Sequence, residues 1–266
     1  MVHIKSQREI ELMRKAGKLV AQILQEVAKS VGPDVSLLDL DRQAEKLTLE
    51  AGAKPAFKGY LGFRHTLCTS VNEQIVHGIP STRKLNKGDI IGLDYGLILN
   101  GYYGDSAVTV PVGSISPEAQ KLMKVTRDSL YAAIETARPG KTLKDIARAI
   151  ENTVNPHGYG IVKEFVGHGI GQKLHEEPQV PNYVEGATLM ELKPGMALAI
   201  EPMINQGTPT TKVLSDKWTA VTRDGSLSAH YEHTIIIGDK ETEILTEWEE
   251  PRFSRYIEGA TTDGRP

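Results

Sequence analysis

The chain has 266 residues, of which 39% are hydrophobic and 24% are charged, and its formal net charge is -3. This is the balance of an ordinary globular protein with a sizeable core. A net charge near zero, without runs of basic residues, argues against a protein built to bind nucleic acid or an anionic membrane.

The sequence also bears on the compartment. Met1–Ser6 has no apolar core of the kind that secretory signals carry. The longest apolar stretches, such as Ile90–Leu93 and Ile235–Ile237, have the length of a strand and are far shorter than a membrane span. Cys68 is the only cysteine, so no intramolecular disulfide can form. We therefore expect a soluble protein of the cytoplasm.

The first 112 residues read as two helices followed by strands. A helix is predicted from about Ser6 to Lys29, because Ser6 and Glu9 form a capping box ahead of apolar residues at helical spacing. A second helix is predicted to start at Ser36, which again has an acid, Asp39, three residues later. A strand-rich stretch follows from about residue 67 to residue 112.

The same order of elements then repeats. Ser116 followed by Pro117 is a typical helix start, and we predict a helix to about Ala137. Thr142 with Asp145 starts another helix, and strands are predicted to return from about residue 163. The segment from residue 251 to residue 266 has no periodicity, and we expect a flexible tail there.

The two halves also match residue by residue. Seven positions of the helix starts between residues 33 and 45 recur 106 positions later, from Pro33 and Pro139 to Glu45 and Glu151 (139 − 33 = 151 − 45 = 106). Chance and common helix-start chemistry are the alternative explanation. We interpret the pattern as one catalytic domain over residues 1–250, duplicated as halves of about 1–112 and 113–250, with a site between the halves.

A hairpin near the middle of the chain carries two acids. Asn100-Gly101 indicates a two-residue turn, so that paired positions sum to 201. Asp94 then lies opposite Ala107, and Asp105 shares its face as a diagonal neighbour, roughly 7–8 Å away along the backbone. Two carboxylates on a mostly apolar face favour cation binding, although two solvated surface aspartates near a turn are the alternative.

Further candidate ligands stand at strand positions of the second half. His168 lies in a glycine-rich strand edge, Glu201 ends an apolar strand, and Glu232 lies inside another strand. A single residue of this kind usually has a structural role. Four carboxylates and one histidine, spread over both halves, favour two divalent metal ions such as manganese, iron(II), cobalt or zinc.

These residues resemble the type I methionine aminopeptidases, and the resemblance covers about Ile4 to Trp248. Their combined order and spacing are specific, while each motif alone is weak. Five segments carry the resemblance: Val71–Pro80, the Asp94–Asp105 hairpin, Gly167–Gly171, His175–Pro178, and Ile200–Pro202 together with Tyr231–Thr234.

The resemblance implies a pita-bread fold of mixed α/β class, with two pseudo-symmetric αβ halves around a central curved antiparallel sheet. It implies that the metal ligands are Asp94, Asp105, His168, Glu201 and Glu232, with Asp105 and Glu232 bridging the metals. It also implies catalytic and substrate-binding roles for two histidines outside the ligand set, His77 and His175.

The family's methionine pocket carries over onto Tyr60, Phe63, Cys68 and Trp218. Two pocket positions depart from the common bacterial residues: Phe57 stands where a cysteine is frequent, and Leu174 where a phenylalanine is frequent. Both remain apolar, so these departures affect the expected shape of the pocket more than its character. Aromatic residues such as Tyr60 and Phe63 are also common core residues, which is the alternative for this pocket.

The implied activity is removal of the initiator methionine from nascent proteins, with a preference for a small second residue. A hydroxide shared by two metals would attack the carbonyl, because metals lower the pKa of bound water. Glu201 would move the proton, and His175 would stabilise the oxyanion. The implied partners are nascent N-termini, with transient ribosome association and a monomeric state.

Alternatives remain at this point. A proline-directed relative, such as a prolidase or an aminopeptidase P, would use similar ligands, and a non-catalytic binding protein could share the fold. His77 and His175 could each be structural histidines bonded to a backbone carbonyl. Glu176 or Glu177 beside His175 could instead form a surface ion pair with it and raise its pKa.

Overall fold

The helices begin where their caps predict. The computed structural model describes residues 2–248. Helix α1 spans Gln7–Lys29 and is capped by Ser6, whose backbone N–H and hydroxyl both donate to the Glu9 carboxylate at 2.8 Å. Helix α2 spans Leu37–Glu50, with Ser36 as its cap. Both predictions are confirmed.

The second pair of helices is confirmed in the same way. Helix α3 spans Pro117–Thr136 behind the Ser116 cap, and helix α4 spans Leu143–Val154 behind Thr142 and its capping box with Asp145. Strand β6 begins at Gly160, three residues before the predicted return of strands (163 − 160). The tail predicted over residues 251–266 lies outside the described residues.

The strands form one large sheet and two small ones. The large sheet has nine strands in the order β1-β4-β5-β14-β9-β7-β8, with β2 beside β4 and β15 beside β14, and every pairing is antiparallel. Its strands are β1 (Lys54–Pro55), β2 (Leu67–Val71), β4 (Ile90–Leu99), β5 (Tyr102–Pro111), β7 (Gly167–Gly169), β8 (Glu176–Val180), β9 (Ala197–Ile200), β14 (Glu232–Ile237) and β15 (Thr242–Ile244).

The small sheets have three strands each, in the orders β13-β10-β6 and β11-β12-β3. Two single turns of 3₁₀ helix, η1 (Tyr60–Gly62) and η2 (Asn155–His157), complete the described elements. The strands of the small sheets are β3 (Gln74–Val76), β6 (Gly160–Ile161), β10 (Met203–Asn205), β11 (Thr211–Val213), β12 (Ala220–Thr222) and β13 (Ser228–His230).

The central hairpin has the predicted register. Strands β4 and β5 pair from Ile90 with Pro111 to Leu99 with Tyr102, so that each pair sums to 201. The turn residues Asn100 and Gly101 both have positive φ, 53° and 83°, as a tight hairpin turn requires. This register fixes where every side chain of the hairpin points.

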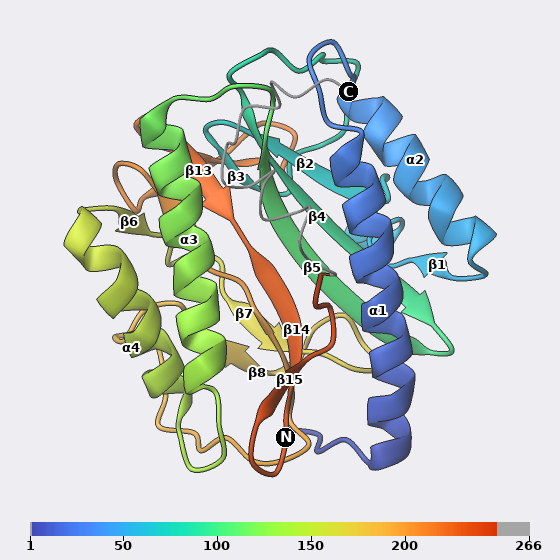
Figure 1. The fold of residues 1–266 in the computed structure, drawn as a ribbon, viewed down its shortest axis with the longest axis vertical. Helices are drawn as coiled ribbons and strands as arrows, with labels where there is room; N and C mark the ends of the chain where they lie inside the picture. The colour runs from blue at the N-terminus through green and yellow to red at the C-terminus, as the bar shows by residue number, and fades with distance from the viewer. Residues whose placement is uncertain (1, 249–266) are drawn as a thin grey trace, which may run out of the picture.

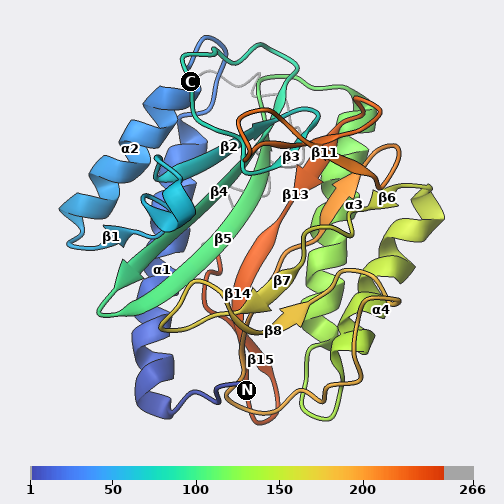
Figure 2. The same cartoon turned by 180° about the vertical axis from the view of Figure 1, so that it is seen from behind.

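The four α-helices all lie on one side of the large sheet. Figures 1 and 2 show α1 and α3 crossing one face of the sheet, with α2 and α4 flanking them. Alternation along β4 turns Leu93, Tyr95 and Leu97 into the core cluster shared with α1 and α2. Asp94 therefore faces the opposite side of the sheet, which carries no α-helix. The described residues include no helix that is both long and apolar enough to cross a membrane.

Equivalent backbone hydrogen bonds occur in both halves. The N–H of Asp34 donates to Leu85 O at 2.9 Å, and that of Gly140 donates to Leu192 O at 3.3 Å. The bridge between Ser36 and Lys84 likewise has a counterpart between Thr142 and Glu191. These contacts fall at the sequence offsets of 106 and 107, and they support the proposal of a duplicated unit.

Candidate functional site

Two carboxylates project from the hairpin onto the face of the sheet that carries no α-helix. Asp94 pairs with Ala107 across β4 and β5, and Asp105 pairs with Gly96. The small partners leave room above the sheet. Asp105 is 4% exposed and Asp94 is partly covered, and one oxygen of each is buried without a hydrogen-bond partner among the described residues.

Strand β14 joins the two halves of the sheet at this point. Glu232, its first residue, pairs with Ala107 of β5, and His233 pairs with Ile200 of β9. Glu201 follows β9 directly, and His168 on β7 pairs with Ala199. Residues 94 and 105 from the first half and 168, 201 and 232 from the second half thus meet on one patch of sheet.

The side chains in this patch lie within a few ångströms of each other. Ligand atoms of Asp105, His168 and Glu232 all lie within 4.8 Å of one another. His168 Nε2 is 3.6 Å from Glu201 Oε1 and 4.0 Å from Asp105 Oδ2. Asp94 lines the same cavity. The structure therefore brings all five expected ligands together.

The electrostatics of this cluster are those of an uncompensated acidic site. Burial, and then repulsion from neighbouring carboxylates, raises the pKa of Asp105, Glu201 and Glu232 well above the ordinary range, and burial raises the pKa of Asp94 to about 7. Glu232 Oε1 is also buried without a hydrogen-bond partner among the described residues. Four clustered carboxylates, three of them with a buried oxygen that has no partner among the described residues, fit cations, which would remove both the repulsion and the missing partners.

The histidine of the cluster is oriented as a metal ligand. His168 Nδ1 lies 2.9 Å from the carbonyl oxygen of Gly169, and a carbonyl can only accept, so Nδ1 carries the proton. The unprotonated Nε2 therefore faces the carboxylates. Burial lowers the pKa of His168 to about 3, which keeps the ring neutral and its lone pair available.

One cavity of about 160 Å³ holds the carboxylates on part of its wall and apolar side chains on the rest. Phe63 and Trp218 meet edge to face in its wall, with ring centroids 5.1 Å apart. Phe57 and Leu174 are buried among these residues, so both departures from the common family residues keep the cavity apolar. The remaining lining residues are Tyr60, Leu61, Cys68, His77, Asp94, Asp105, His168, His175, Glu201 and Glu232.

The two expected catalytic histidines both line the cavity. His175 Nδ1 is 2.7 Å from the Tyr60 hydroxyl, and its ring meets that of His168 edge to face at 4.3 Å between centroids. His77, at φ 60°, lies 6.3 Å from the Trp218 ring. Burial lowers the pKa of both histidines, to about 4 for His77.

The alternative in which Glu176 pairs with His175 is wrong. The Glu176 carboxylate turns away from the cavity and lies 2.5 Å from Lys5 Nζ. The pKa of His175 is lowered rather than raised, because the ring is partly buried. His175 is bonded to a tyrosine side chain rather than to a backbone carbonyl.

Sequence reasoning missed two residues of the site. His230 Nε2 lies 3.7 Å from Glu201 Oε2 and is buried without a hydrogen-bond partner among the described residues. Leu61 is 81% exposed and lines the cavity. His230 could have been predicted, because it stands two positions before Glu232 in a predicted strand and such residues face the same side. An apolar residue between Gly59 and Gly62 gives no comparable pattern for the second.

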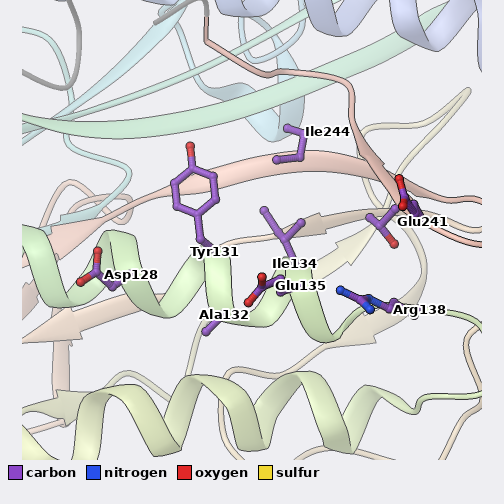
Figure 3. A pocket seen from close by; sticks show the side chains of 9 residues that line it. Asp128, Tyr131, Ala132, Ile134, Glu135, Arg138, Glu241 and Ile244 are labelled. Atoms are coloured by element: carbon purple, nitrogen blue, oxygen red, sulfur yellow. The ribbon is translucent and has the colours of Figure 1, made fainter. Parts of the chain in front are cut away.

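A larger groove of about 600 Å³ lies elsewhere, between α3 and β15 (Figure 3). Its lining includes apolar side chains, Tyr131, Ile134 and Ile244, and the charged side chains of Glu135 and Arg138. None of the expected ligands or pocket residues lines it. The chemistry of the molecule is therefore in the smaller cavity.

The fold and this cluster define a metallopeptidase. The profile of metallopeptidase family M24 matches residues 11–239, and the chain belongs to this family. The expected divalent-metal binding thus agrees with both the family and the buried acidic and histidine cluster.

Within the family, the chain is similar to methionine aminopeptidases. It is 50% identical over 246 residues to methionine aminopeptidase 1 of Bacillus subtilis, which covers 92% of this chain and 99% of the relative. The crystal structure of a methionine aminopeptidase from Thermotoga maritima has a TM-score of 0.90 and 45% identity, over 93% of this chain and 100% of that chain. The predicted pita-bread fold is confirmed.

The proline-directed alternative is less similar. The prolidase from Pyrococcus furiosus matches with a TM-score of 0.74 and 25% identity, over 93% of this chain but only 66% of the prolidase. The shared fold explains this match. The sequence identity to the methionine aminopeptidases, 45–50%, is much higher than the 25% identity to this prolidase. The prolidase alternative is therefore not favoured.

Proposed function

We propose that this chain is an aminopeptidase that removes the initiator methionine from nascent proteins, preferring a small second residue. One observation carries the proposal: the cluster of Asp105, His168 and Glu232 lines the same cavity, of about 160 Å³, as a group of apolar side chains. A cavity of this size suits one apolar side chain. About half of the residues are identical to those of proteins named methionine aminopeptidase, which supports this substrate.

The metal ligands in this proposal are Asp94, Asp105, His168, Glu201 and Glu232, which would hold two divalent ions. Asp105 and Glu232 would be shared by both ions. When bound, such ions act as Lewis acids and lower the pKa of water to near neutrality. Oxygen-rich ligation with a single nitrogen suits manganese, iron(II), cobalt or zinc.

The protein's own residues position the substrate. The methionine side chain enters the cavity, where its flexible thioether contacts the Tyr60, Phe63 and Trp218 rings and the Cys68 side chain. The neutral His77 ring accepts a hydrogen bond from the amide nitrogen of the second residue, since its lowered pKa leaves a free lone pair. The scissile bond then lies between His77 and His175.

Two residues act on the reacting atoms. Glu201 accepts a proton from the attacking water and returns it to the leaving amine. His175 donates a hydrogen bond to the carbonyl oxygen as negative charge develops there. When the Tyr60 hydroxyl donates to His175 Nδ1, the ring proton lies on Nε2, the nitrogen free to face the substrate.

The biological setting follows from the substrate. The partners are N-termini of nascent polypeptides, which places the enzyme in the cytoplasm with transient association to ribosomes. We propose that it acts as a monomer, because the cavity and all five ligands belong to one chain.

The proposal is tested with three peptides. The manganese-loaded protein is incubated with Met-Ala-Ser, Leu-Ala-Ser and Ala-Pro, and the released amino acids are quantified. We expect release of methionine at least about tenfold faster than release of leucine, since an ill-fitting side chain in an apolar pocket costs 1–3 kcal/mol. Equal rates for the first two peptides would refute the methionine pocket, and preferential cleavage of Ala-Pro would restore the prolidase alternative.

A further inference from the structure

The N-terminal segment is joined to the active-site loop by a buried ion pair. Lys5 Nζ lies 2.5 Å from Glu176 Oε2, and the two residues are 171 positions apart in the chain. The Lys5 side chain is only 2% exposed and that of Glu176 16%. A lysine this deeply buried is rare without a partner, so the pair is a fixed contact rather than a surface encounter.

The second carboxylate oxygen of Glu176 binds backbone amides of its own loop. Glu176 Oε1 accepts from the backbone N–H of Gln172 at 2.8 Å and of Lys173 at 3.2 Å. One carboxylate thus binds the lysine with one oxygen and two loop amides with the other. These bonds lower the pKa of Glu176 despite partial burial, so the group stays ionised at neutral pH.

The packing around this carboxylate leaves no spare room. A Cβ at Gly171 would lie 2.5 Å from Lys5 Nζ and 2.7 Å from Glu176 Oε1. The backbone of Lys5 is itself fixed, because its N–H donates to Gly195 O at 2.8 Å. Gly171 O accepts from the N–H of Tyr103 on β5, which ties the loop to the sheet.

The loop held in this way carries two residues of the proposed site. Leu174 is buried in the wall of the cavity, and His175 also lines it. His175 is the residue directly before Glu176, so the bonds that hold the Glu176 carboxylate also restrain the backbone of His175. The Tyr60 hydroxyl bonds to Nδ1 of the same imidazole and leaves Nε2 free.

We propose that Lys5 and Glu176 are positioning residues for the reaction: their ion pair holds the loop Gly171–Glu176 so that His175 meets the scissile carbonyl. This inference rests on the proposed function. A buried ion pair adds little net stability compared with apolar side chains of the same size. Its contribution is the placement of the loop.

The test uses variants that leave no lone buried charge. Lys5→Met with Glu176→Ala removes the ion pair and the acceptor for both loop amides. Lys5→Met with Glu176→Gln removes the charges but keeps an acceptor. The matched control is Lys173→Met with Glu177→Ala, which makes the same changes at exposed positions of the same segment.

We expect the Lys5→Met, Glu176→Ala enzyme to lose about ten- to a hundredfold in kcat on Met-Ala-Ser, the scale of a misplaced catalytic group. Its metal content by elemental analysis should equal that of the wild type. The Glu176→Gln version should lose less, and the control should stay within about twofold. If the alanine version does not fold, the glutamine version gives the same comparison with a smaller loss.

The decisive measurement adds His175→Ala to each of the two double variants that remove the ion pair. Because the loop acts through His175, removing the ion pair should cost no more than about twofold further once the imidazole is gone. A full additional loss in the His175→Ala background would overturn the inference, as would unchanged kcat in the wild-type background or an equal loss in the control.

Hydrogen exchange separates this inference from the proposed function. The amides of Gln172 and Lys173 should be protected in the wild type and lose protection in the Lys5→Met, Glu176→Ala protein, whatever the substrate. If the wild type does not cleave Met-Ala-Ser, the proposed function fails while exchange still reports on the loop. Unchanged protection would refute the placement by the ion pair.

Discussion

The hydrogen bond between Tyr60 and His175 offers the most conservative test of the site. Tyr60→Phe removes one oxygen atom and keeps the aromatic ring that lines the cavity. The lost contact is a 2.7 Å bond to His175 Nδ1. Without it, no described residue donates to Nδ1 to favour the tautomer that has its proton on Nε2, and the imidazole is free to turn.

The size of the effect follows from that single bond. A side-chain hydrogen bond contributes about 0.5–1.5 kcal/mol net. Because about 1.4 kcal/mol corresponds to a tenfold change in rate, kcat should fall about two- to twelvefold. KM should change less than about twofold, since the ring still contacts the methionine side chain.

Steady-state kinetics on Met-Ala-Ser, with metal content measured in parallel, give both constants. Tyr159→Phe is the matched control, because Tyr159 lies near α4 and lines a separate surface hollow. Two results would refute the reasoning: a kcat for Tyr60→Phe equal to that of the control, or a rise in KM with kcat unchanged. The second result would make Tyr60 a pocket residue alone.

Further predictions concern the metals, the two reacting groups and the first helix. Chelation should abolish peptide cleavage, and manganese, cobalt or iron(II) should restore it; activity in protein shown to be metal-free by elemental analysis would contradict the mechanism. Glu201→Gln should lower kcat at least about a hundredfold, and a value within threefold of wild type would assign the base elsewhere. His175→Ala should lower kcat about a hundred- to a thousandfold with normal metal content. His77→Ala should lower kcat by an amount that depends on the leaving group. If either variant loses metal in proportion to its activity, that histidine is a ligand or a structural residue. The pKa of Glu9 is lowered to about 2, mainly by the hydrogen bond that the Ser6 backbone N–H donates to its carboxylate. Glu9→Gln should therefore reduce the free energy of unfolding by about 1–3 kcal/mol at pH 7. That difference should vanish as the pH falls from 4.5 to about 2, and urea titrations showing a constant difference would disprove the assignment.

The parts of the fold that the sequence predicts are those with local causes. Helix starts were predictable because Ser6 and Thr142 each have an acid three residues later, which completes a capping box. The hairpin register was predictable because Asn100-Gly101 permits only a tight turn. That register alone placed Asp94 and Asp105 on one face of the sheet.

What the sequence did not predict depends on contacts between distant segments. The approach of Glu201 to His168 follows from the pairing of β7 with β9, which no local pattern encodes. Glu176 has an acidic neighbour and a histidine beside it, yet it binds Lys5. The small sheets were missed because strands of two or three residues are too short to show periodicity.

The position of β14 sets when the active site can exist during synthesis. This strand lies in the middle of the sheet, between β5 and β9, although it is one of the last elements of the chain. A growing chain that stops before Glu232 lacks the strand that pairs with both β5 and β9, and it lacks one acidic side chain of the site. We therefore expect a chain that ends before Glu232 to be inactive rather than weakly active, because its two halves cannot join in one sheet.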